Sequence, residues 1–209
     1  MTEADFLALL HGAVLTVLFS VAAMVIGVPA GLGMALVRWA RVPVASPVVA
    51  VLVSILRAAP AVTLALLIFF ALPQAGLSLD PWAAGVATLT LSTAAFNCEI
   101  WRAALLALPR DQMDAALAMG MRRGVRFRRI VLPQVTRAAL PALVNELTLL
   151  VKVSPAIAVL GVVDITRAAV RIGAQTYDPL PPFMVALVIY SSIVFLFVRV
   201  QRMVERRYA

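Results

Sequence analysis

Long apolar stretches alternate with short polar stretches along this chain. Five apolar stretches of about 20 residues or more contain few charges, and they cover approximately residues 6–37, 48–72, 82–102, 136–163 and 182–200. A helix of about 20 apolar residues crosses a hydrocarbon core of roughly 30 Å and satisfies its own backbone hydrogen bonds there. The pattern therefore predicts an all-α integral membrane protein with five transmembrane helices and with its termini on opposite sides.

The polar stretches are short, with one exception. Residues 103–135 form a large extramembrane loop, whereas residues 73–81 and 166–181 are expected to be short loops rich in turn-forming residues. The first apolar stretch is too long for a signal peptide and lacks a cleavage pattern, so we expect a retained helix. Because no linker or repeat divides the chain, a single transmembrane domain is expected over residues 1–209.

Composition agrees with membrane insertion, because hydrophobic residues make up 63% of the chain, charged residues 13%, and the mean hydropathy is +1.01. Arginine placement predicts the orientation, because cytoplasmic loops carry an excess of Lys and Arg. In this topology one side carries only Arg167 and Arg171. The other side carries Arg38, Arg41, Arg102, Arg110, Arg122, Arg123, Arg126, Arg128, Arg129, Arg137, Arg199, Arg202, Arg206 and Arg207. We therefore expect the N-terminus outside and the C-terminus in the cytoplasm.

The net charge of +8 thus comes mainly from the arginines that set the topology, and the lipid bilayer is the expected surrounding medium. No nucleic acid partner is expected, because no motif with interleaved aromatic residues accompanies the arginines. Cys98 is the only cysteine, which excludes an intrachain disulfide. The sequence contains no catalytic triad, metal-ligand spacing or phosphate loop, so we expect neither an enzyme nor a metal or cofactor bound by this chain.

A charged residue lies inside the second apolar stretch. Arg57 comes three residues before Pro60, and an arginine at the membrane centre costs roughly 2.5–3.5 kcal/mol on the translocon scale. Such a residue is expected to face a pathway or an ion-pair partner, or alternatively to extend its side chain toward the cytoplasmic surface. Arg57 and Pro60 are therefore candidate residues of a substrate pathway.

The fourth stretch carries further polar residues at helical spacing. Asn145, Thr148 and Lys152 recur every three to four residues, which predicts a shared helix face and a second part of the pathway. Glu146 lies on the adjacent face, where ion pairing with an arginine and a role in the pathway are both open. Pro155 lacks a backbone N–H, so a kink or an unwound turn is expected just after Lys152.

Two shorter patterns concern helix packing. Glu99 and Arg102 lie three residues apart, which predicts a local ion pair near the base of the large loop. Gly27 and Gly31 form a small-xxx-small pair, which permits a neighbouring helix to approach the first helix closely.

The large loop contains a short helical pattern. Pro109 can open a helix, Asp111 and Asp114 suit its first turn, and alanines follow. Gly120 can take the left-handed conformation that ends a helix. We therefore predict a small surface helix that a partner outside the membrane binds.

The same loop resembles a known motif, E-A-A-x-x-x-G-x(9)-I-x-L-P, of binding-protein-dependent ABC importer permeases. Residues 96–102, 130–134 and 141–145, with Lys152, are similar to the polar amino acid permeases of the histidine, glutamine and arginine type. This resemblance runs from about Gly12 to the C-terminus and implies the type I ABC importer permease fold. The motif positions are Asp114, Ala115, Ala116, Gly120, Ile130, Leu132 and Pro133.

The resemblance implies a cytoplasmic coupling helix over residues 111–120 that inserts into a groove of an ATPase. Its implied coupling residues are Asp111, Gln112, Asp114, Ala115, Ala116 and Gly120. The implied partners are an ABC ATPase dimer that binds ATP and Mg²⁺, a second permease subunit of the same or a different kind, and an extracytoplasmic solute-binding protein. We expect an inner-membrane importer subunit that forms the translocation pathway for polar amino acids or related solutes.

Two departures from the family pattern concern the solute. Where relatives usually have R-G-T-P-L, residues 57–61 read R-A-A-P-A, and where they often have K-D-T-S-L, residues 152–156 read K-V-S-P-A. These changes remove acidic and hydroxyl groups that could line a solute site in the relatives. An opine, a sulfur compound or an osmolyte therefore stays an alternative solute. A membrane channel or scaffold that needs no ATPase is a further alternative.

Overall fold

The computed structural model describes residues 1–208, which are largely helical and contain no β-strand. Its side chains are described except at residues 204, 207 and 208, so the side chain of Arg207 lies outside the described part. Two 3-10 segments, η1 (Pro73–Ala75) and η3 (Ser154–Leu160), and a π-helical segment, η2 (Phe127–Val131), join the α-helices. The α-helices are α1 (Glu3–Trp39), α2 (Ala45–Ala58), α3 (Ala61–Ala71), α4 (Pro81–Leu106), α5 (Arg110–Ala118), α6 (Arg123–Arg126), α7 (Leu132–Val153), α8 (Ile165–Thr176) and α9 (Leu180–Tyr208).

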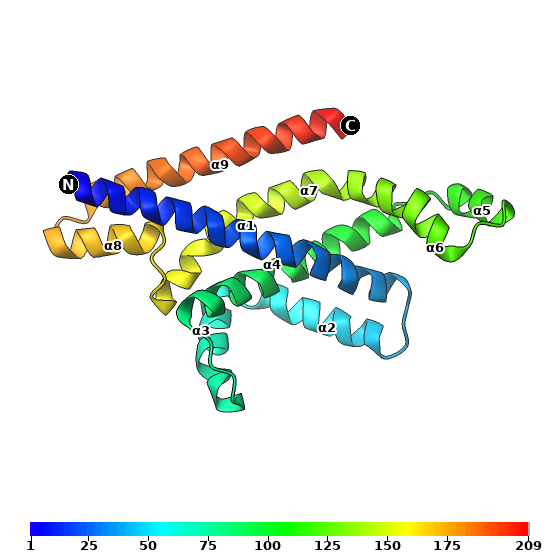
Figure 1. The fold of residues 1–209 in the computed structure, drawn as a ribbon, viewed down its shortest axis with the longest axis horizontal. Coiled ribbons are helices and arrows are strands. Elements are labelled where there is room, and N and C mark those ends of the chain that lie inside the picture. The colour runs from blue at the N-terminus through cyan, green and yellow to red at the C-terminus, as the bar shows by residue number, and fades with distance from the viewer. Residues whose placement is uncertain (209) are drawn as a thin grey trace.

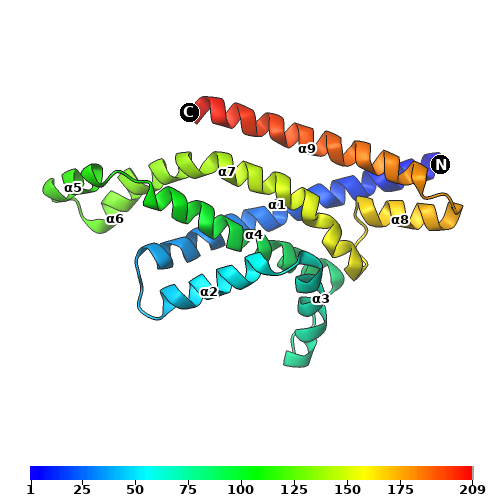
Figure 2. The ribbon, with the colours of Figure 1, turned by 180° about the vertical axis from the view of Figure 1, so that it is seen from behind.

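Four long helices run along the length of the molecule. Figures 1 and 2 show α1, α4, α7 and α9 lengthwise, with α5 and α6 beyond one end and α8 near the other. The N-terminus lies beside α8, whereas α9 runs from that end toward the side that carries α5. α1 packs most extensively on α4, and α4 also contacts α2, α3 and α7. The main core therefore surrounds α4.

Local chemistry explains where α1 begins and how closely it approaches α4. The Thr2 hydroxyl accepts from the Asp5 N–H at 3.3 Å, and the Asp5 carboxylate accepts from the Thr2 N–H at 2.7 Å, which forms a capping box. A Cβ on Gly31 would lie 2.9 Å from the Ala94 carbonyl oxygen, and a Cβ on Gly27 would collide with Thr93. The small-xxx-small pair therefore allows close packing of α1 on α4.

The second predicted span is not one continuous helix. The chain bends by 111° between α2 and the helical segment Ala61–Ala75. Pro60 lacks a backbone N–H and disfavours helical geometry at the residue before it, and Ala59 is extended at φ −70° and ψ 129°. The prediction of a single helix over residues 48–72 is therefore wrong, because the proline divides this segment into two shorter helices.

Three helical segments of the described chain are long and apolar enough to cross a membrane individually, and the bent α2–α3 pair adds a fourth. The three individual segments are Glu3–Trp39, Arg123–Leu160 and Leu180–Met203. α4, the third predicted span, has 26 residues but is not one of these segments. Its buried polar residues include Thr88, Thr93 and Asn97, which neighbouring helices shield from lipid.

The fourth predicted span changes its helical geometry at the expected position. α7 ends at Val153, and the chain continues as η3 until Gly161, which has a positive φ of 93°. Pro155 lies in the first turn of η3, where its missing N–H costs no helix hydrogen bond. The α-helix therefore ends just after Lys152 as expected, but it continues as a tighter 3-10 helix and not as an unwound turn.

The segment predicted as an outer loop at residues 166–181 contains α8, which is a correction. Asp164 caps this helix, because its Oδ1 accepts from the Arg167 N–H at 2.7 Å. The buried residues Ile165, Ala168 and Ile172 recur at helical spacing and pack in a second cluster with residues of α1 and α9. The same periodicity is present in the sequence, but turn-forming residues flank it and favour a loop over the stretch as a whole.

Candidate functional site

α5 projects from one end of the long-helix bundle as an almost entirely exposed helix (Figure 1). Asp111, Gln112, Asp114 and Ala115 are exposed on it, whereas Ala116 is only 3% exposed. Met113 is half-buried and packs against the main core, so α5 is attached through its inner face. The predicted coupling residues therefore lie on the free surface, except Ala116, which packs inward.

α5 ends in a sharp turn. Gly120 has a φ of 68°, which glycine adopts at little cost, and it is exposed. Its N–H donates to the Leu117 carbonyl at 2.9 Å, and the Met121 N–H donates to the Ala116 carbonyl at 3.1 Å. This pair of hydrogen bonds is a Schellman motif, which satisfies the last carbonyls of α5 and reverses the chain.

Two apolar side chains beside this turn were not among the predicted site residues. Leu117 is 55% exposed and Met119 is 82% exposed. They add apolar surface to the exposed end of α5 beside the Gly120 turn. The signal in the sequence was their presence within an otherwise polar loop.

The base of α5 is joined to α1 by charged residues. The Glu99 carboxylate forms ion pairs with Arg38 of α1 and with Arg102, whose Nε lies 2.9 Å from Glu99 Oε2. The Trp101 indole N–H also donates to the Val28 carbonyl at 3.0 Å. The structure thus contains the expected Glu99–Arg102 pair and adds Arg38, which is remote in sequence. These contacts hold the end of α4, from which α5 continues, against α1.

The bend between α2 and α3 exposes Arg57 and Pro60. The Arg57 guanidinium carbon lies 5.2 Å from the centre of the Phe96 ring on α4, within the range of a cation–π interaction. Within the described residues, Arg57 forms no ion pair. The structure therefore places this charge against an aromatic face of the central helix.

The three polar residues of α7 do not share one environment. Asn145 and Lys152 are exposed, whereas Thr148 is buried and its hydroxyl donates to the Val144 carbonyl at 3.3 Å. Lys152 lines a cavity of about 260 Å³ with Pro155, Tyr190 and two other α9 residues. The cavity therefore lies where α7 changes into η3 and faces α9. Arg57 does not line it.

Glu146 faces α4 and is 7% exposed. It accepts a hydrogen bond from the Thr93 hydroxyl at 3.2 Å, and the Asn97 amide donates to that hydroxyl at 3.3 Å. Among the side chains that the structure describes, no arginine is within ion-pair distance of Glu146. Of the two open roles of Glu146, a direct ion pair with an arginine is therefore absent among the described side chains, and polar residues of α4 contact the carboxylate instead.

Comparison with known proteins identifies the class of this chain. Residues 27–209 match the family described as binding-protein-dependent transport system inner membrane component. The chain belongs to this family. It is a transmembrane permease subunit, and the class predicted from the loop motif is confirmed.

Similar proteins come from amino acid transport systems. The chain is 37% identical to the arginine transport system permease protein ArtQ of Bacillus subtilis (strain 168) over 155 residues, or 74% of this chain and 71% of ArtQ. It is 31% identical to the L-cystine transport system permease protein TcyB of the same organism over 209 residues, or 99% of this chain and 89% of TcyB. A solved structure described as an amino acid ABC transporter with histidines matches with a TM-score of 0.89 at 30% identity, covering 99% of this chain and 100% of that chain. The predicted permease fold is therefore confirmed.

Proposed function

We propose that this chain is the transmembrane subunit of an inner-membrane ABC importer for polar amino acids or related solutes. The observation that carries this proposal is α5, an exposed helix that ends in a rigid glycine turn outside the apolar segments. The arginine and cystine permeases to which the chain is similar support the solute class.

In this proposal the N-terminus and α8 lie outside, and α5 and the C-terminus lie in the cytoplasm. The support is the distribution of arginines, which concentrate at the end that carries α5. This orientation directs α5 toward a cytoplasmic ATPase and α8 toward an extracytoplasmic solute-binding protein.

α5 would transmit the state of the ATPase to the pathway. Asp111, Gln112, Asp114 and Ala115 would enter the groove of the partner, while inward-packed Ala116 keeps α5 attached to the bundle. ATP and Mg²⁺ would bind and react in the ATPase dimer, so this chain takes no part in hydrolysis. A shift of α5 would move α4 and α1 together, because Glu99 bridges them.

The cavity beside Lys152 would form part of the translocation pathway. A lysine ammonium on an exposed helix face attracts a carboxylate, which every amino acid carries. Asn145 and Thr148 precede it on α7, and Arg57 and Pro60 would line the pathway at the bend of the second segment. Little of α9 is buried within the chain, so a second permease subunit, identical or different, would cover part of its surface.

A transport assay tests the proposal. The chain is reconstituted with its ATPase, second permease subunit and binding protein, and ATP-dependent uptake of labelled arginine, glutamine and cystine is measured. Gly120→Val should abolish solute-stimulated ATP hydrolysis, because a β-branched residue does not tolerate a φ of 68°. Gly33→Val is the matched control, because a Cβ there meets no atom within 4 Å and the φ is not positive.

The pathway role is tested separately with Lys152→Gln. We expect a higher KM for uptake of an amino acid and an unchanged association with the ATPase. Unchanged uptake would contradict the role of Lys152. If only an opine, another sulfur compound or an osmolyte stimulates ATP hydrolysis, the proposed solute class is wrong. If solute crosses the membrane without any ATPase, the proposal of an ABC importer is wrong.

A further inference from the structure

The segment that follows Gly120 concentrates positive charge without internal partners. No Asp or Glu occurs between Asp114 and Glu146. The ion pairs of the described side chains all involve Glu99, so no carboxylate lies within 4.0 Å of an arginine in this segment. Solvent or an external anion must therefore compensate the charge. The arginines are Arg122, Arg123, Arg126, Arg128, Arg129 and Arg137.

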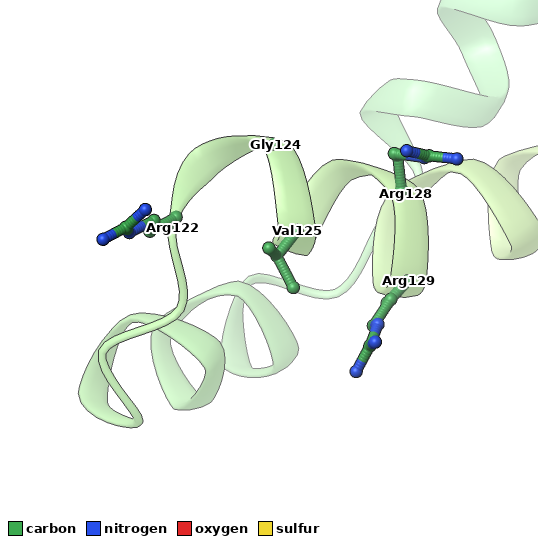
Figure 3. A pocket seen from close by; sticks show the side chains of 5 residues that line it. All are labelled: Arg122, Gly124, Val125, Arg128 and Arg129. Carbon is green, nitrogen blue, oxygen red and sulfur yellow. The ribbon is translucent and has the colours of Figure 1, made fainter.

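Three of these arginines surround a hollow in the surface. Arg122, Arg128 and Arg129 are exposed and line a volume of about 740 Å³ together with Gly124 and Val125 (Figure 3). In Figure 3 the Arg122 side chain points away from the other two, and Arg128 and Arg129 point to opposite sides of the helix. One small anion cannot contact all three guanidinium groups in this arrangement. The arginines instead present a broad basic surface.

The position of this surface relative to the apolar core argues for lipid. η2 continues directly into α7 at Leu132, and the segment Arg123–Leu160 is long and apolar enough to cross a membrane. Arg128 and Arg129 precede residue 136, where the apolar stretch begins, by eight and seven residues, which is roughly 10–12 Å at the helical rise. Long arginine side chains extend back along a helix toward the lipid phosphates from such positions.

The other lining residues fit the same environment. Val125 is 41% exposed, so an apolar side chain lies among the arginines. No atom approaches within 4 Å of the position that a Cβ on Gly124 would take, so the hollow is open to a headgroup. Guanidinium groups also form strong bidentate hydrogen bonds with phosphate oxygens.

We propose that residues 122–129 bind the phosphate-bearing headgroups of anionic lipids in the leaflet beside the start of α7. Several phosphates of a fluid lipid layer can meet guanidinium groups that point in different directions, whereas a single bound ion cannot. Lipid contact here fixes the depth of η2 and the direction in which α5 leaves the membrane. The membrane itself therefore sets the height of the surface that a partner binds.

Lipid retention by the purified complex tests this proposal. The transporter is purified with its co-purifying subunits and incubated with micelles that contain equal amounts of phosphatidylglycerol and phosphatidylcholine. Native mass spectrometry then measures the ratio of the two bound lipids. The variant R122Q/R128Q/R129Q is compared with R122K/R128K/R129K, which keeps the charge. We expect the glutamine variant to lose about tenfold or more of its preference for phosphatidylglycerol and the lysine variant to keep most of it.

Four outcomes contradict the proposal. An unchanged lipid ratio in the glutamine variant shows that these arginines do not bind lipid. An unchanged ratio with loss of the ATPase from the complex shows that they bind an acidic protein surface. Saturable binding of inorganic phosphate without any preference between the two lipids shows that they bind a free anion. Loss of the preference in the lysine variant as well shows that charge is not the cause.

Discussion

Replacing Gly31 with alanine tests the close contact between α1 and α4. An ideal Cβ at Gly31 would lie 2.7 Å from the Asn97 Cβ and 2.9 Å from the Ala94 carbonyl oxygen. Ordinary van der Waals contact begins at 3.4 Å, so the two helices must separate by about 0.7 Å at this point. Both opposing atoms belong to the backbone or to the rigid start of a side chain, so neither can rotate away.

We expect the Gly31→Ala variant to lose about 1–3 kcal/mol of stability, which is the usual cost of overpacking a rigid contact. The separation also weakens neighbouring links between α1 and α4, including the hydrogen bond from Trp101 to the Val28 carbonyl. Thermal unfolding of the purified complex in detergent, followed by size-exclusion chromatography, should show a melting temperature lower by several degrees.

Gly33→Ala is the matched control on the same helix. A Cβ at Gly33 meets no atom within 4 Å, and alanine favours a helix by up to about 1 kcal/mol over glycine. The control should therefore melt at the same or a slightly higher temperature. If Gly31→Ala melts like Gly33→Ala, α1 and α4 do not approach as closely as described, and the packing argument fails.

Three further predictions concern single contacts. Arg38→Gln should reduce stability by about 1–3 kcal/mol and Arg102→Gln by about 0.3–0.5 kcal/mol, because the Arg38 side chain is 17% exposed and the Arg102 side chain 36%. Equal melting temperatures for the two variants would show that burial does not set the strength of the Glu99 pairs. Pro60→Ala restores a backbone N–H between α2 and α3, so spin labels at their outer ends should move apart. An unchanged spin-label distance would mean that packing, and not Pro60, maintains the 111° bend. Asp164→Ala removes the N-cap of α8 and should lower the stability of this helix by about 1 kcal/mol, so the α8 amides should exchange hydrogen about fivefold faster. Asp164→Asn keeps a capping oxygen and should preserve the protection of these amides. Equal exchange in both variants would contradict the capping role.

The elements that depend on local chemistry were largely predictable. Most of the long apolar stretches correspond to long helices, the helix after Pro109 ends in the turn at Gly120, and the α-helical geometry ends just after Lys152. The break at Pro60 and the start of α8 after its Asp164 cap also follow from local chemistry, but hydropathy averaged over a long window does not resolve either feature.

Other features depend on contacts between distant residues. Arg38 and Glu99 are 61 positions apart, and Thr93 and Glu146 are 53 positions apart, so no helical spacing connects them. The inward direction of Ala116 and the exposure of Leu117 likewise depend on how α5 rests against the core. Spacing along the sequence predicts which residues share a helix face, but it does not predict what that face meets.

The sequence by itself determined that this protein is a helical membrane permease and, within a few residues, where α1, α4 and α5 begin and end. Apolar length, proline and glycine act within a few residues, so their effects are readable from the chain alone. Only the tertiary structure decided which charges are paired, which polar residues are buried and which part of α5 is free. Those outcomes depend on the close approach of α1, α4 and α7, which brings together groups that the sequence separates.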